Sequence, residues 1–492
     1  MANSIEIEKK KKENVFKRFG HAFVNFFAGI GRYFSEGSIG TKLSFFIFGA
    51  GNFSRRQFVK GALFLLVQVA IILYMVLCPC VTGPNNVQVP TGYKSLINLK
   101  LQGKEAGWDP ITHTVQPADS SILMLLFGLV TIAVICLYIL VWITNIKSSF
   151  AADQAVKEGK KPSNFKQDCK ELLDSKFHIL MLTPTCLAAL IFTVLPTVFM
   201  ISMAFTTYND IDMMAVPTTL FHWNGLTNFI SIFKGEGSLG REIAARFLPV
   251  LGWTFIWAIF ATLTCYFGGI LLAILINKKG LKGKKIFRTF FILTIAIPQF
   301  ISLLAVRNLL SASGPINTFL VNSGIAESPI GFLGNNTFGD NPYVAKVMVI
   351  VINMWLGIPY TMLMTSGILM NIPSDLYEAA KVDGTSPAKM FFKITLPYVI
   401  FVTTPYLISS FIGNINSFNT IFLLTGGGPS VAGAYKAGET DLLVTWLYKL
   451  TIDNGDYNTG AVIGIFTFII TATITLIAYR NSKAYKEEDT FQ

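Results

Sequence analysis

The side chains that could do chemistry in this sequence are polar groups set inside strongly apolar stretches. The clearest are Asn353 and Tyr360 on one stretch and Ser410, Asn414 and Ser417 on another. A polar group inside hydrocarbon is costly unless it faces a water-filled cavity or bonds a neighbouring helix. Amides and hydroxyls placed in this way can hold a polar solute, although serine and asparagine in such stretches also commonly bond another helix.

A short polar segment, residues 371–397, separates these two apolar stretches. Apolar residues recur at helical spacing after Ser374, which is a candidate N-cap. Gly384 can adopt the left-handed conformation that ends such a helix, and Ser386 with the proline after it can begin a second one. The pattern predicts a helical hairpin at a membrane surface, a shape that presents side chains to a groove in a partner protein.

The composition predicts an integral membrane protein. The chain has 492 residues, of which 52% are hydrophobic and 14% charged, whereas soluble domains have about a quarter charged residues. Eight apolar runs are long enough to cross a bilayer, which takes about 20 residues, so the predicted fold is all-α with eight transmembrane helices. These runs lie near residues 61–81, 121–144, 179–205, 249–276, 289–311, 344–370, 396–424 and 459–479.

The basic residues predict the orientation of the spans. If residue 1 is cytoplasmic, 30 of the 40 lysines and arginines fall in cytoplasmic segments and 8 in outer loops. The excess of positive charge inside places both termini in the cytoplasm. The net charge of +12 is explained by this topology, and no nucleic-acid partner is needed. Trp253 and Trp257, near the outer end of their span, are expected to anchor it at the membrane interface.

The sequence offers little for catalysis, metal binding or ion coupling. The four histidines are far apart, the six cysteines contain no CxxC pair, and no G-x-x-x-x-G-K-[ST] nucleotide motif occurs. Acid and base residues do not converge as a membrane enzyme would require. The eight spans contain no aspartate or glutamate, which disfavours an ion-coupled carrier. A transport subunit that takes its energy from another protein is therefore expected.

The hairpin, together with two further blocks, resembles a known family. Glu378-Ala-Ala, Gly384 and the Ile-Thr-Leu-Pro run ending at Pro397 resemble the EAA loop of ABC importer permeases. The block at 353–360 and the block at 410–443 are similar to permeases of the MalF type, from about Lys176 to the C-terminus. The resemblance implies an ABC type I importer permease fold and a loop that docks on an ATPase. The implied coupling residues are Glu378, Ala379, Ala380, Gly384, Leu396 and Pro397.

The resemblance also implies a sugar site on the two spans that flank the hairpin. Amides and hydroxyls would bond the sugar, and Trp355, Tyr360 and Phe418 could cover its apolar patches. Some members of the family carry a large extracytoplasmic domain after the third span, whereas residues 206–248 form only a short loop here. The implied sugar contacts are Asn353, Leu356, Gly357, Tyr360, Ser410, Gly413, Asn414 and Ser417.

The implied function is ATP-driven import of maltose, maltodextrin or a similar oligosaccharide by alternating access. The alternatives are a permease for a different oligosaccharide and, less favoured, an ion-coupled secondary transporter. The expected partners are a second, MalG-like permease subunit, a MalK- or MsmK-like ATPase dimer that binds ATP and Mg²⁺, and an extracytoplasmic sugar-binding protein. No cofactor is expected on this chain, and its expected location is the bacterial cell membrane.

Five regions are expected along the chain. Residues 1–60 are basic and aromatic and predict a helix lying in the lipid interface, with a helix packed on the bundle as the alternative. The others are two additional N-terminal spans (61–144), a cytoplasmic loop (145–178), a six-helix permease core containing the hairpin (179–479) and a cytoplasmic tail (480–492).

Overall fold

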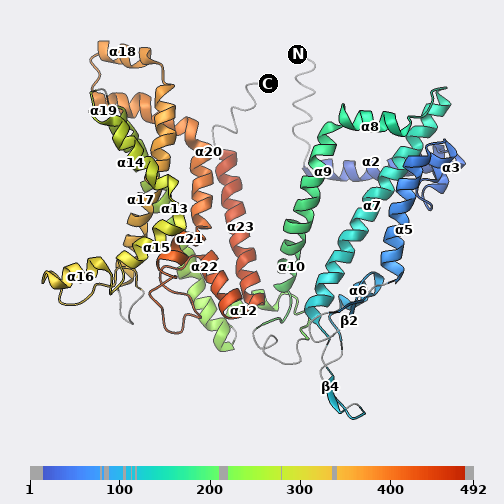
Figure 1. The fold of residues 1–492 in the computed structure, drawn as a ribbon, viewed down its shortest axis with the longest axis horizontal. Helices are drawn as coiled ribbons and strands as arrows, with labels where there is room; N and C mark the ends of the chain where they lie inside the picture. The colour runs from blue at the N-terminus through green and yellow to red at the C-terminus, as the bar shows by residue number, and fades with distance from the viewer. Residues whose placement is uncertain are drawn as a thin grey trace. The chain divides into compact units, whose positions relative to one another are not determined.

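The computed structural model is helical, with long apolar helices and short connecting elements (Figure 1). Its contacts divide the chain into two units, one of Met1–Ser202 with Ile211–Trp223 and one of Met203–Asp210 with Asn224–Gln492. The structure describes residues 15–77, 80–82, 88–103, 107–111, 113–116, 119–209, 220–235, 237–278, 280–334 and 341–481. The predictions for residues 1–14 and for nearly all of the C-terminal tail fall outside these ranges.

In the described part of the chain, seven helices are long and apolar enough to cross a membrane, and one bent pair of helices brings the number to eight. The chain is therefore a multi-pass membrane protein, as predicted. The seven are α5 (Phe58–Leu77), α7 (Ser121–Lys157), α9 with α10 (Phe177–Ala189 and Leu195–Met203, joined by a π-helical turn), α13 (Gly237–Asn277), α17 (Pro342–Met370), the helix ending in α20 (Leu396–Ile415), and α23 (Tyr457–Asn481).

The fifth predicted span, 289–311, is not one straight helix. The chain forms α14 (Lys284–Ala296) and α15 (Gln299–Leu309), which meet at an angle of 94°. Ile297 and Pro298 between them have extended ψ angles of 127° and 129°. A residue before proline is pushed out of the helical region, so Pro298 breaks the span instead of only kinking it.

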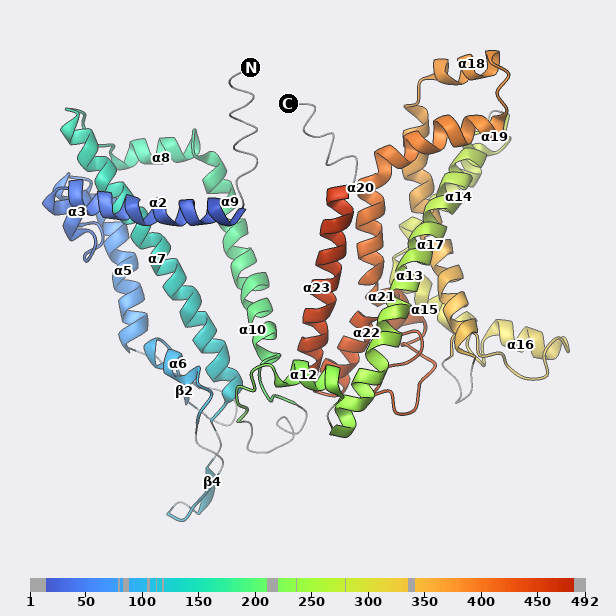
Figure 2. The same cartoon turned by 180° about the vertical axis from the view of Figure 1, so that it is seen from behind.

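The first unit surrounds α5, α7 and α9 with smaller elements. α2 (Val15–Glu36) runs across the direction of α5 and α7, near the start of α5 (Figures 1 and 2). Two antiparallel strand pairs, β1 with β2 and β3 with β4, lie between α5 and α7, from the end of the predicted span 61–81 into the predicted outer loop, and add short strands to a fold predicted as all-α. The remaining bounds are α3 (Ile39–Leu43), α4 (Ala50–Ser54), β1 (Cys80–Thr82), β2 (Gln88–Pro90), α6 (Tyr93–Asn98), β3 (Gly107–Asp109), β4 (Thr114–Gln116) and α8 (Phe165–Leu173).

Helix α7 continues well into the predicted loop 145–178. Asn145, Ser149 and Asp153 follow one face of this extension at four-residue intervals, and all three are fully buried. Asn145 Oδ1 accepts a hydrogen bond from Gly49 N at 2.8 Å, and Asp153 is paired with Arg55. The extension is therefore held by polar contacts with the segment around α3 and α4.

In the second unit, α13 packs against both α17 and α20. A Cβ at Gly357 of α17 would lie 2.5 Å from Cys265 Sγ of α13, so glycine permits this close helix contact. Trp253 and Trp257 are 7% and 0% exposed, which corrects the expectation that they anchor an interface. The other elements are α12 (Thr227–Lys234), α16 (Pro315–Asn322), α18 (Ser374–Val382), α19 (Pro387–Met390), α21 (Phe418–Leu424) and α22 (Leu443–Tyr448), with π-helical turns at Phe391–Thr395 and Lys449–Asp453.

The seventh predicted span, 396–424, is also corrected. The helix begins at Pro387, because α19, a π-helical turn and α20 are continuous, and it ends at Ile415. α21 is a separate short helix after Asn416, whose ψ of 24° is not helical. The second helix of the hairpin is therefore rigidly continuous with a membrane span.

Candidate functional site: a cavity at a broken span and a coupling hairpin

Four of the predicted sugar contacts line one cavity in the second unit. Asn353, Leu356, Gly357 and Tyr360 lie on one face of α17, because their spacing follows successive turns of a helix. The opposite wall is the break between α14 and α15. The cavity has a volume of about 330 Å³, within the usual range for small-molecule sites. Its other lining residues are Thr294, Ile295, Ile297, Pro298 and Gln299.

The four predicted contacts on the other stretch are not part of this lining. Asn414 Nδ2 donates to Thr262 Oγ1 of α13 at 2.9 Å, and Ser417 Oγ donates to Thr420 Oγ1 at 3.1 Å. Gly413 is exposed with no atom within 4 Å of a built Cβ, and Ser410 is half-buried. The structure therefore groups the α17 residues but leaves the four residues on and just after α20 outside the same cavity.

Two contacts connect the cavity to the segment that carries the α20 residues. The rings of Tyr360 and Tyr406 lie 5.9 Å apart, and Tyr406 OH shares a hydrogen bond of 3.3 Å with Thr361 Oγ1. Gln299 Nε2 donates to Thr420 Oγ1 at 3.4 Å, and Thr420 also bonds Ser417. A solute in the cavity would therefore lie next to side chains that α20 and α21 hold.

Sequence reasoning missed Gln299 and Thr294 as lining residues. Gln299 is a polar side chain directly after Pro298 in an apolar run, which is the signal that singled out Asn353. Of the predicted aromatic faces, Tyr360 lines the cavity. Phe418 instead packs on Phe422 at 4.8 Å, in an aromatic cluster with Tyr448.

The hairpin has the predicted shape. Gly384 has φ +67°, Ser386 Oγ accepts a hydrogen bond from Lys389 N at 3.4 Å, and Tyr377 OH shares a bond of 2.8 Å with Thr395 Oγ1 across the two helices. α18 lies at one end of the unit, beyond the ends of α13 and α17 (Figure 2). The predicted N-cap is wrong, because Ser374 is the first residue of α18 and its Oγ lies 3.3 Å from Asp375 Oδ1.

The coupling residues are largely open to a partner. Glu378, Ala379, Gly384 and Pro397 are exposed, and Ala380 and Leu396 are half-buried. Val382 is 88% exposed at the end of α18. Across the described part of the chain, no hydrogen bond or ion pair engages Glu378.

Residues 266–484 match the family of binding-protein-dependent transport system inner membrane components. The galactooligosaccharides transport system permease protein GanP of Bacillus subtilis (strain 168) is 31% identical over 443 residues, covering 89% of this chain and 96% of the relative. The maltodextrin transport system permease protein MalC of Streptococcus pneumoniae serotype 4 is 33% identical over 446 residues, covering 90% and 95%. This chain belongs to the sugar permeases of the MalF type.

A solved structure confirms the predicted fold of this permease. The crystal structure of a bacterial ABC transporter involved in the import of the acidic polysaccharide alginate superposes with a TM-score of 0.50 at 24% identity, covering 64% of this chain and 98% of that one. The relatives are transport permeases, which confirms the prediction of a transport subunit and not an enzyme. Among the described residues of the permease, no group of histidine, cysteine and acidic side chains could hold a metal ion.

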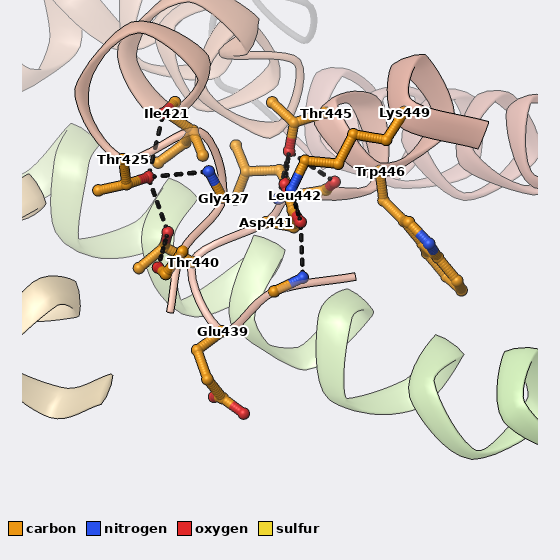
Figure 3. A network of polar contacts seen from close by, with 12 residues as sticks. Ile421, Thr425, Gly427, Glu439, Thr440, Asp441, Leu442, Thr445, Trp446 and Lys449 are labelled. Carbon is orange, nitrogen blue, oxygen red and sulfur yellow. Dashed lines mark hydrogen bonds and ion pairs between the residues drawn. The ribbon is translucent and has the colours of Figure 1, made fainter. Parts of the chain in front are cut away.

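The permease also has an ordered loop between α21 and α23, built around the fully buried Asp441 (Figure 3). Asp441 Oδ2 accepts hydrogen bonds from Gly438 N at 2.7 Å and Lys449 Nζ at 2.6 Å, and Oδ1 accepts one from Thr445 Oγ1 at 2.8 Å. Gly427 has φ +85° and packs directly on this carboxylate, so no side chain fits there. Residues 426–429 and 440–443, both within the block at 410–443 that resembles MalF-type permeases, thus form one loop structure.

Glu439 connects that loop to α17, which lines the cavity, and to α13, which packs against α17. Its carboxylate pairs with Arg246 of α13 at 2.8 Å and with Lys346 of α17 at 2.7 Å, and in Figure 3 it points away from Asp441. Burial raises the pKa of Glu439, but the hydrogen bonds and positive charges of Lys346 and Arg246 outweigh burial and leave the pKa below its usual value. Lys346 Nζ also lies 5.2 Å from the ring centroid of Trp253.

Proposed function

We propose that this permease passes maltodextrin or a similar oligosaccharide across the bacterial cell membrane. The observation that carries the proposal is the cavity between α17 and the broken span, where Asn353, Gln299 and Tyr360 surround one space. A sugar needs amide and hydroxyl partners for its hydroxyls and an aromatic ring for its apolar faces, and these three side chains supply them. MalC, which is named for maltodextrin transport, supports the choice of sugar.

The four predicted contacts on and just after α20 form the second half of the proposed sugar site. Ser410, Gly413, Asn414 and Ser417 would contact the sugar when α17 and α20 close around it, since Tyr406 already touches Tyr360. The substrate would then lie between two spans that flank the hairpin. Movement of the hairpin could therefore open or close the site.

A separate ATPase dimer supplies the energy in this proposal. Glu378, Ala379, Ala380, Gly384, Leu396 and Pro397 would dock into its groove, with Glu378 paired to a basic residue there. ATP and Mg²⁺ would bind the ATPase and not this chain. The continuous helix from Pro387 to Ile415 supports the mechanism, because a push on the hairpin passes directly into a membrane span.

Two further partners complete the proposed importer. A second, MalG-like permease subunit would form the other wall of the pore, and an extracytoplasmic sugar-binding protein would deliver the substrate. A solved relative is described in complex with an alginate pentasaccharide-bound periplasmic protein, which supports the second partner.

The proposed orientation places both termini and the hairpin in the cytoplasm. The distribution of lysine and arginine supports it. α2 would then lie in the inner lipid interface, as its direction across α5 and α7 suggests. Residues 61–144 would add two spans to a six-helix permease core at 179–479, and the family match over 266–484 supports the second half of that core.

The proposal is tested by reconstituting this chain with its ATPase, second permease subunit and binding protein. Uptake and ATP hydrolysis are measured for maltooligosaccharides and for galactooligosaccharides, the class named for GanP. Maltooligosaccharide uptake that Asn353→Ala or Gln299→Ala reduces several-fold is the expected result. Stimulation by galactooligosaccharides alone would reject the proposed substrate, and unchanged uptake in both variants would reject the proposed site.

A further inference from the structure

Helix α13 contacts both asparagines of the proposed sugar site, although no α13 residue is predicted to touch sugar. Asn414 Nδ2 donates to Thr262 Oγ1 at 2.9 Å, and Asn353 Nδ2 donates to Cys265 Sγ at 3.4 Å. Thr262 and Cys265 are three residues apart and share a helix face. One face of α13 therefore holds side chains from two other spans, α17 and α20.

The backbones at both asparagines are held as well. Trp257 Nε1 of α13 donates to Asn414 O at 3.1 Å, and Cys265 Sγ donates to Asn353 O at 3.5 Å. Thr262 and Cys265 are only 5% and 8% exposed, so water does not compete for these contacts. Each asparagine is thus fixed to α13 through its main chain and its side chain.

This arrangement decides which end of each amide a ligand can reach. A carboxamide has a nitrogen that donates and an oxygen that accepts, on opposite arms of a planar group. Both nitrogens are turned to α13, whereas no described residue donates a hydrogen bond to either Oδ1. The amide oxygens are therefore the arms left for a ligand that donates hydrogen bonds, as a sugar hydroxyl does.

We propose that Thr262 and Cys265 are positioning residues that turn the Oδ1 atoms of Asn414 and Asn353 toward the sugar. The inference rests on the proposed function, since it takes both asparagines as sugar contacts. Neither α13 residue touches the substrate. They act by fixing the amide orientation, so that the site selects sugars with hydroxyl donors at two matching places.

Tyr266 provides a matched control for ordinary helix packing. Its hydroxyl shares a hydrogen bond of 2.6 Å with Thr403 of α20, close to Thr262 on the same helix interface. Thr403 is buried and is not a proposed sugar contact. Tyr266→Phe therefore removes a comparable bond between α13 and α20 without releasing a sugar-binding side chain.

The test measures equilibrium binding of radiolabelled maltotriose to the purified complex without binding protein, together with the thermal stability of the complex. Thr262→Val keeps the shape and removes the acceptor, and it should weaken binding roughly five-fold, the effect of one lost neutral hydrogen bond. Thr262→Ser should restore wild-type affinity. Cys265→Ala should weaken binding in the same direction, and Tyr266→Phe should leave affinity unchanged.

Three outcomes would overturn the inference in distinguishable ways. If Asn353→Ala and Asn414→Ala leave maltotriose binding unchanged, the proposed sugar site is wrong and the positioning role falls with it. If those two variants weaken binding but Thr262→Val leaves maltotriose affinity unchanged, as Tyr266→Phe does, the proposed sugar site is supported and only the positioning role is rejected. If Thr262→Val, Cys265→Ala and Tyr266→Phe all lose affinity and stability to the same extent, these residues only pack the helices and do not position the asparagines.

Discussion

Replacing Gly357 by alanine should disturb the contact between α13 and α17. The new Cβ would lie 2.5 Å from Cys265 Sγ and 3.2 Å from Cys265 Cβ. Carbon atoms in favourable contact are about 3.5–4.0 Å apart, so the methyl group overlaps its neighbour. Overpacking of this kind costs about 1–3 kcal/mol. Because Asn353 and Tyr360 lie one turn to either side, the shift should also deform the cavity and reduce uptake.

Gly367→Ala is the matched control, since no atom lies within 4 Å of its built Cβ on the same helix, α17. Both substitutions gain the helix propensity of alanine, about 1 kcal/mol, so the difference between them isolates the overlap. Thermal stability of the purified complex and sugar uptake are measured for each. Adding Cys265→Ala to Gly357→Ala removes Sγ and should recover most of the lost stability. Equal stability of the two glycine variants, or no recovery in the double variant, would refute the close contact.

Three further predictions concern charged groups. Glu439→Gln should lower the stability of the complex by roughly 1–3 kcal/mol at neutral pH, because two cations lose their partner. The pKa of Glu439 is depressed in the folded protein. Its contribution to stability is therefore fully present above the ordinary glutamate pKa and is lost as the pH falls through the folded-state pKa. Melting temperatures of wild type and variant should converge only in acid. Glu378→Lys should leave the chain in the membrane yet abolish ATP-driven uptake, and normal uptake would contradict a coupling role. Arg55→Ala leaves the buried Asp153 without its cation and should lower the stability of the first unit by roughly 3–5 kcal/mol. The first unit should then be proteolysed faster in Arg55→Ala than in the control variant Arg56→Ala.

Hydropathy and turn chemistry predicted much of this molecule. Spans depend on a sum of transfer free energies along the chain, so seven of the eight runs correspond to the membrane helices found here. The hairpin also followed from local chemistry, because a glycine with φ +67° and a serine N-cap act within a few residues. The sequence rules were less reliable at Ser374, where the helix begins at the serine itself.

The breaks and extensions of helices were harder to predict. The run 289–311 was expected to form one span, but the chain turns by 94° at Pro298, and α15 packs against α21. α7 continues to Lys157, into the predicted cytoplasmic loop 145–178, because Asn145, Ser149 and Asp153 have buried partners around α3 and α4. Both outcomes depend on contacts between residues far apart in sequence.

The sequence by itself determined the membrane spans, the hairpin and the two spans that carry polar residues within their apolar stretches. Tertiary structure decided which of those polar groups share a space. Asn353 and Tyr360 line a cavity with Gln299, whereas Asn414 is not part of that lining, although both asparagines bond α13. The physical reason is that periodicity places a side chain on a helix face, but the way the other helices pack decides which faces border the same cavity.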